Sequence, residues 1–139
     1  MATNVVLALG EVTRPSKALN IVLWSLQILA AALFLFAGGL KLAGVEPMVV
    51  MFENIGLGQW FRYLTGGLEV ICAILLLVPA TVALSGALLA VTMVGAIATH
   101  LLVTGGSSVP AIVLLVMVST VAWCRWPVSI SGKNRKGNQ

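Results

Sequence analysis

The hydrophobic positions of the chain fall into four long runs, which short polar or glycine-rich segments separate. A helix that crosses a membrane needs roughly 20 predominantly apolar residues. The pattern therefore predicts an all-α fold, a four-transmembrane-helix antiparallel bundle. Its expected spans are residues 18–43, 60–78, 81–103 and 109–126. Pro79 stops the second run, and the turn before the third is so short that these two helices must be antiparallel neighbours.

The segment between the first and second runs, residues 44–59, is not a span because acidic, amide, proline and glycine residues interrupt it. Within it, residues 48–52 are apolar, and Glu46 and Glu53 flank them. An apolar stretch of this length with charged flanks is typical of a helix that lies on the membrane surface. We expect a short interfacial helix here.

The two ends of the chain are polar by comparison. Residues 1–17 are expected to form a cytoplasmic N-terminal arm, and residues 129–139 a basic cytoplasmic tail without ordered structure. The transmembrane domain, residues 18–128, lies between them, with its last helix ending near Pro127. The first run is too long and begins too late for the apolar part of a cleaved signal peptide, which has about 7–15 residues.

Composition supports a membrane environment. Hydrophobic residues make up 60% of the chain and charged residues only 9%, whereas soluble domains contain about 25% charged residues. The partner that this surface requires is the lipid bilayer. The net charge of +4 comes from cations near the two ends of the chain, so it does not indicate binding of nucleic acid.

The distribution of cations predicts the orientation. One side of the membrane carries Arg14, Lys17, Arg125, Lys133, Arg135 and Lys136, and the other carries Lys41 and Arg62, offset by Glu46 and Glu53. The positive-inside rule then places both termini in the cytoplasm (N-in/C-in), in a multi-pass protein of the cell inner membrane. Tryptophan and tyrosine agree with this orientation, with Trp24, Trp123 and Trp126 on the inner side and Trp60 and Tyr63 on the outer side.

Several kinds of chemistry are absent from the sequence. Cys72 and Cys124 form no Cys-x-x-Cys pair, and we expect both to be reduced and unpaired. The chain has no aspartate, a single histidine and no phosphate-binding or dinucleotide-binding glycine motif. Catalytic triads, a metal site and a covalently bound cofactor are therefore not predicted.

Four ionisable residues lie within or at the edge of the predicted spans: Lys41, Arg62, Glu69 and His100. Charged side chains inside a membrane are costly and often mark functional sites. The direction of each helix places all four in the outer half of the membrane. Glu69 follows Arg62 by seven residues, so it lies roughly 10 Å deeper.

Helical spacing suggests that three faces converge on one polar pocket. The stripes are Gln27, Ala31, Phe34, Gly38 and Lys41 on the first helix, Arg62, Gly66 and Glu69 on the second, and Thr92, Ala96, Thr99 and His100 on the third. The small residues in these stripes are expected to leave room beside the charged groups.

Each ionisable residue also has an explanation that needs no ligand. Lys41 can extend to the headgroups, Arg62 can anchor the helix at the interface, and His100 can be a rim residue. Glu69 lies too deep to reach water, so it requires a cation or a proton. Two alternatives remain for Glu69: a structural ion pair with Lys41 or Arg62, or a site that handles protons or a ligand.

Three segments together resemble the DoxX family of small four-helix membrane proteins. They are residues 36–42 (FAGGLKL), residues 62–69 (RYLTGGLE) and residues 95–101, which contain His100. The resemblance extends over about residues 20–126, and Lys41, Glu69 and His100 match polar positions associated with the family. It implies association with redox complexes or with the assembly of membrane partners. The lack of paired cysteines argues against an independent redox reaction.

Two functions follow from this resemblance and the polar cluster. The first is a redox-associated accessory subunit that binds a quinone-like or other small lipophilic molecule through Lys41, Glu69, His100 and Arg62, with Glu69 and His100 handling protons. The second is a non-catalytic assembly or scaffold factor in which the same residues form a structural network. Either function would involve a membrane partner protein and leaves the oligomeric state and any enzymatic activity open.

Overall fold

The structure, a computed structural model, describes the backbone of residues 15–134 and the side chains of residues 15–126. Every regular element in this part of the chain is helical, which confirms the all-α prediction. The elements are α2 (Lys17–Ala43), α3 (Glu46–Ile55), α4 (Gln59–Leu76), α5 (Val82–Thr99), the π-helical turn η1 (His100–Thr104) and α6 (Val109–Asn134). The predicted N-terminal arm lies largely outside the described residues.

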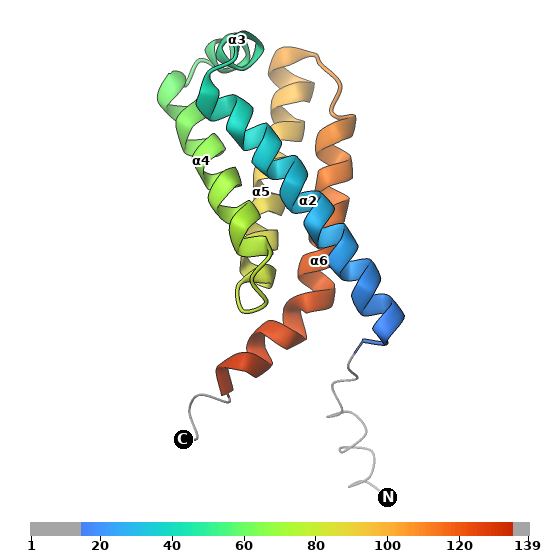
Figure 1. Ribbon diagram of the computed structural model, residues 1–139. Helices are drawn as coiled ribbons and strands as arrows, with labels where there is room; N and C mark the ends of the chain where they lie inside the picture. Colours follow the sequence, from blue (N-terminus) through green and yellow to red (C-terminus); the bar gives the residue numbers. More distant parts are fainter. Residues whose placement is uncertain (1–14, 135–139) are drawn as a thin grey trace, which may run out of the picture.

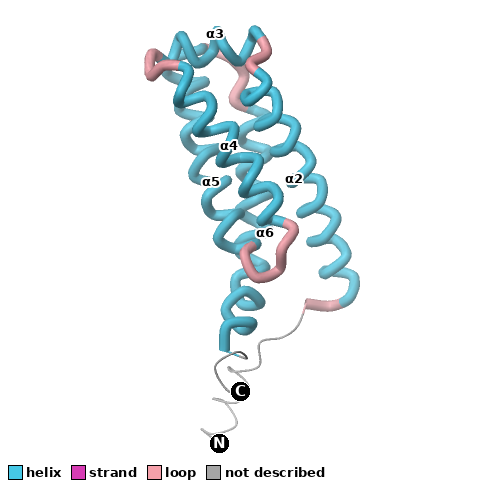
Figure 2. The backbone as a smooth tube through the Cα atoms, turned by 60° about the vertical axis from the view of Figure 1, so that its left-hand side comes forward, coloured by secondary structure: helices cyan, strands magenta, loops and turns pink. Residues whose placement is uncertain are grey.

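The four long helices lie side by side, and α3 lies across one end of them (Figures 1 and 2). Helix α2 packs against α4 and α6, and α5 packs against the same two helices. The beginning of α2 and the end of α6 both lie at the opposite end from α3 (Figure 1). We call these the α3 end and the open end. The short turn between α4 and α5 makes them antiparallel neighbours, as the sequence predicts.

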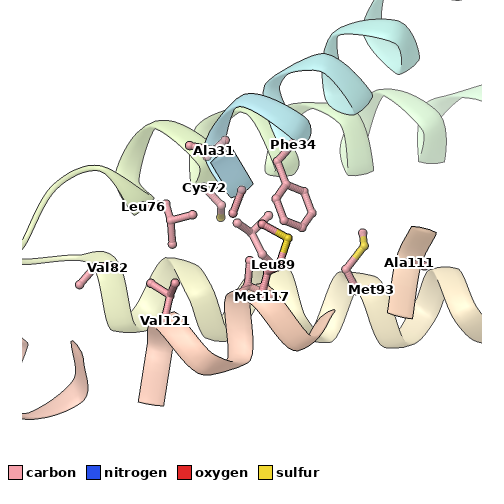
Figure 3. Packing of buried hydrophobic residues seen from close by; sticks show 13 residues of the cluster. Ala31, Phe34, Cys72, Leu76, Val82, Leu89, Met93, Ala111, Met117 and Val121 are labelled. Atoms are coloured by element: carbon pink, nitrogen blue, oxygen red, sulfur yellow. The ribbon is translucent and has the colours of Figure 1, made fainter. Parts of the chain in front are cut away.

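A continuous apolar core runs between the four long helices (Figure 3). Phe34, Leu76, Leu89, Val118 and Val121 are all fully buried in it, so each long helix contributes to the core. The outward faces are apolar as well, with many large side chains such as those of Phe36, Val91, Leu102 and Trp123 exposed. Helices that are apolar on all sides are stable in lipid.

Within the described residues, three helices are long and apolar enough to cross a membrane. They are Lys17–Ala43, Val82–Thr104 and Val109–Trp126. Helix α4 is not among them, although the sequence analysis counts it as a span. The reason is compositional, because Gln59, Arg62 and Glu69 lie within it. Arg62 and Glu69 are buried against the neighbouring helices.

The last helix is longer than predicted. Its expected end is near Pro127, followed by an unordered tail, but α6 continues to Asn134. A proline within a helix removes one backbone hydrogen bond and usually bends the helix. The red part of α6 in Figure 1 runs at an angle to the orange part, as expected of a helix that continues past a proline. Residues 135–139 of the predicted tail lie outside the described residues.

Helices α2 and α4 approach each other closely at two facing glycines. A Cβ atom on Gly38 would lie 2.9 Å from the carbonyl oxygen of Gly66, and one on Gly66 would lie 3.1 Å from the carbonyl oxygen of Gly38. These distances are too short for a side chain, so only glycine permits this approach. The next residue on each helix, Gly39 and Gly67, faces open space.

This contact predicts opposite effects for neighbouring glycines. Gly38→Ala or Gly66→Ala should destabilise the protein by about 1–3 kcal/mol, because the added methyl group forces the helices apart. Gly39→Ala and Gly67→Ala are matched controls and should be neutral or stabilising by up to about 1 kcal/mol, because alanine favours the helix. Thermal unfolding in mild detergent measures both. Equal effects of Gly38→Ala and Gly39→Ala, or of Gly66→Ala and Gly67→Ala, would contradict the close contact.

Candidate functional site

Lys41 and Glu69 form an ion pair near the α3 end. The Nζ atom of Lys41 donates a hydrogen bond to Oε2 of Glu69 at 2.7 Å. The carboxylate is almost inaccessible, with 2% of the Glu69 side chain exposed, whereas 16% of the Lys41 side chain is exposed. Lys41 also lies in the last turn of α2, where a cation interacts favourably with the helix dipole. The deep carboxylate thus has a cation as its partner.

The glycine contact positions this pair. A Cβ atom on Gly66 would lie 2.9 Å from Cβ of Lys41, and one on Gly38 would lie 3.2 Å from Cβ of Glu69. The two charged side chains therefore emerge from helices that touch beside them. The sequence predicts that small residues leave room next to the charges, but at Gly38 and Gly66 the neighbouring helix occupies that room.

Arg62 is buried with only 4% of its surface exposed, so it is more than an interface anchor. Its Nη1 donates a hydrogen bond to the carbonyl oxygen of Lys41, at the end of α2. Its Nε donates to Oε1 of Gln59 at 2.6 Å. The guanidinium carbon lies 4.3 Å from the centre of the Tyr63 ring, which adds a cation–π interaction. Arg62 thus connects α4 to the C-terminal carbonyls of α2.

Gly44 makes room for this guanidinium. It ends α2 in the left-handed conformation with φ = 68°, and its N–H bonds to carbonyl oxygens of the last turn. A Cβ atom at this position would lie 3.2 Å from Nη1 of Arg62. Both the backbone conformation and the contact therefore favour glycine.

Gln59 extends the network to α3, and the sequence analysis did not single it out. Its Nε2 donates to the carbonyl oxygen of Val49 at 3.0 Å, while its Oε1 accepts from Arg62. The rings of Phe52 on α3 and Phe61 on α4 pack at a centroid distance of 5.9 Å. The sequence signal was the spacing of three residues from Gln59 to Arg62, which places both on one face of a helix.

His100 lies at the α3 end but takes no part in this network. Its Nδ1 lies 3.1 Å from Oγ1 of Thr104, one π-helical turn further along. No hydrogen bond or ion pair between described residues joins His100 to Lys41, Arg62 or Glu69. The sequence analysis extended the α-helix through residue 103, whereas the structure changes to π-helical geometry at His100.

The predicted stripes are largely buried on α2 and α4 and half-buried on α5. Gln27, Ala31, Phe34 and Gly38 of α2 are buried, and so are Arg62, Gly66 and Glu69 of α4. On α5 the buried residues are instead Val82, Ala83, Ser85, Gly86, Leu89 and Met93. The hydroxyls of Thr92 and Thr99 donate to carbonyls of their own helix. Thr92, Ala96, Thr99 and His100 are half-buried, and no hydrogen bond between described residues joins them to the ion pair.

The remaining chemistry of the described residues is sparse. Cys72 is buried and Cys124 exposed, and both are free thiols, as predicted. No group of histidine, cysteine and acidic side chains within the described part of the chain is arranged to hold a metal. A groove of about 360 Å³ runs along α4, lined by Tyr63, Leu64, Gly67, Leu68, Ile71 and Cys72. Lys41, Arg62, Glu69 and His100 do not line this groove.

The apolar outer surface, the three span-like helices and the buried ion pair together define a multi-pass integral membrane protein. Its family follows from a direct comparison. The sequence model of the DoxX-like family matches residues 25–123, and the chain belongs to this family. No curated protein and no solved structure matched the chain. The match includes Lys41, Arg62, Glu69 and His100.

The ion pair makes a prediction about stability. Glu69→Gln leaves Lys41 without its counter-ion in a poorly solvated site, and should destabilise the protein by about 3 kcal/mol. Adding Lys41→Met should recover most of this loss, because the neutral pair needs no charge balance. Unfolding midpoints in mild detergent give both values. Glu53→Gln, at an exposed position on α3, is the control, and an equal effect there would contradict the role of the pair.

Proposed function

We propose that all four long helices cross the membrane, with both termini in the cytoplasm of a cell whose inner membrane holds the protein. Helix α4 lies between α2 and α5, which are long and apolar enough to span. Its two charged side chains are buried against the neighbouring helices. A helix whose polar groups are paired inside the protein tolerates lipid on its other faces. The open end carries Lys17 and Arg125, in line with the positive-inside rule.

This topology predicts the accessibility of two serines. In a protein with Cys72→Ala and Cys124→Ser, a single cysteine at Ser107 should react with a membrane-impermeant maleimide from outside intact cells. A single cysteine at Ser131 should react only after the membrane is opened. The two positions lie beyond opposite ends of the last apolar run. Reaction of both from the same side would rule out the proposed orientation.

We further propose that the protein is a non-catalytic accessory subunit that supports a membrane partner. The observation that carries this proposal is the internal pairing of the charged groups in the polar cluster. Glu69 is paired with Lys41, and Arg62 donates to Gln59 and to the end of α2. A group that already has its hydrogen-bond partners gains little from a ligand, because the existing bonds must first break. The cluster therefore acts as a brace between α2, α3 and α4.

A partner helix would find a suitable surface on α4. Gly67 faces open space within the groove that Leu64, Leu68 and Ile71 help to form. Small residues on a lipid-facing helix allow another helix to approach closely. The groove is held in place by the brace on the opposite face of the same helix.

The second candidate is a small lipophilic molecule with a redox role, such as a quinone. The shallow groove along α4 supports it, because its lining is almost entirely apolar. Tyr63 provides an aromatic ring and a hydroxyl at one end of the apolar groove. Binding of such a molecule by Lys41, Glu69, His100 and Arg62 stays a prediction, and it requires the ion pair to open.

Filling the groove tests the proposal that a partner protein binds along α4. Gly67→Leu should fold normally, because nothing lies within 4 Å of the added carbon, and should lose partner proteins that copurify with the wild type. Gly39→Leu, which also faces open space on α2, is the control and should retain them. Mass spectrometry of proteins and small molecules retained in mild detergent is the measurement.

The same measurement separates the two candidates. The double variant Lys41→Met/Glu69→Gln should keep its partners if the cluster is a brace. If it folds but loses a copurified small molecule that the wild type retains, the ligand-binding function replaces the accessory one.

A further inference from the structure

Arg125 is a buried cation at the open end. The sequence analysis counted it among the cytoplasmic anchors, yet only 8% of its surface is exposed. It lies on the same helical stripe of α6 as Val118, Val121 and Ala122, which face the core. That spacing turns its side chain inward between the helices. The spacing was visible in the sequence, but the surrounding tryptophans favoured an interfacial position.

The guanidinium of Arg125 is only partly satisfied. Its central carbon lies 5.3 Å from the centre of the Trp24 ring on α2. Its Nε and Nη2 atoms are buried and have no hydrogen-bond partner. A buried charged donor without an acceptor is strongly unfavourable. Arg62, by contrast, uses its Nε and Nη1 in hydrogen bonds within the protein.

The described residues offer no carboxylate that could pair with Arg125. Glu69 is bound to Lys41, and Glu46 and Glu53 belong to α3 at the far end of the molecule (Figure 1). The other described cation at the open end, Lys17 at the start of α2, adds positive charge. The open end thus presents donors and positive charge, which favour an anion with oxygen acceptors.

We propose that Arg125 and Trp24 form a binding site for the phosphate group of an anionic phospholipid in the leaflet at the open end. The planar guanidinium carries two adjacent donors, Nε and Nη2, in the geometry that binds two phosphate oxygens. Both atoms are covered in the structure, so binding requires the side chain to turn toward the headgroup. In the sequence, Arg125 lies at the end of the last apolar run, two residues before Pro127. Headgroup phosphates lie at this depth when α6 spans the bilayer. The exposed rings of Trp123 and Trp126 flank it, as is typical of the interface.

The site is tested by lipid titration of the full chain in detergent, followed by native mass spectrometry. Arg125→Gln should weaken binding of phosphatidylglycerol about 10- to 100-fold, the loss expected for charge-assisted hydrogen bonds. Arg125→Lys keeps the charge but loses the paired donors, so it should bind with intermediate affinity. Lys17→Gln, which removes an exposed charge at the same end, should change binding less than twofold. Equal losses for Lys17→Gln and Arg125→Gln would show general attraction only and overturn the site.

Two further comparisons identify the ligand. Diacylglycerol with the same acyl chains lacks the phosphate, and its binding should not depend on Arg125. Inorganic phosphate at millimolar concentration should not displace phosphatidylglycerol. Binding of inorganic phosphate that depends on Arg125 and displaces the lipid would instead indicate a site for a soluble anion and overturn the lipid assignment.

Stability without lipid provides an independent check. Arg125→Gln should unfold at or above the wild-type temperature in lipid-free detergent, because it removes a buried charge whose donors have no acceptor in the described protein. A drop as large as that of Glu69→Gln would mean that another group of the chain satisfies Arg125, and the proposal would fail. Circular dichroism confirms that each variant is helical before binding is compared.

Discussion

The arrangement of the α3 end depends on the ion pair between Lys41 and Glu69. A carboxylate buried between helices requires a compensating cation, and the pair fixes the rotation of α2 and α4 relative to each other. The facing glycines, Gly38 and Gly66, bring the backbones close enough for the short contact. Arg62 then extends the connection to the end of α2, and Gln59 extends it to α3. Three helices are joined by this single polar network.

The same pairing explains how a polar helix fits into an apolar protein. Helix α4 carries two charged residues but buries both, while its outward residues Leu64, Ile71 and Ile74 are apolar. Its exterior therefore matches that of the three span-like helices. Composition averaged along α4 understates its compatibility with lipid, because the average does not separate the buried face from the exposed one.

The two ends of the molecule differ in how their charges are balanced. At the α3 end, both charges of the ion pair are met within the protein, and Arg62 has carbonyl and amide acceptors. At the open end, the buried Arg125 has an aromatic neighbour but two donors without acceptors. This asymmetry supports an internal brace at one end and an external anionic ligand at the other.

The sequence alone determined the four long helices, though not all of their ends, together with the family resemblance and the facing stripes of α2 and α4, because polar residues at helical spacing mark a single face on each. On α5, apolar residues surround the helix, so periodicity did not identify its fully buried residues, which are Val82, Ala83, Ser85, Gly86, Leu89 and Met93. Only the tertiary structure separated His100 from the ion pair, chose Lys41 over Arg62 as the partner of Glu69, and buried Arg125. Periodicity gives the faces of a helix, whereas the rotation and depth at which helices meet are decided by packing between them.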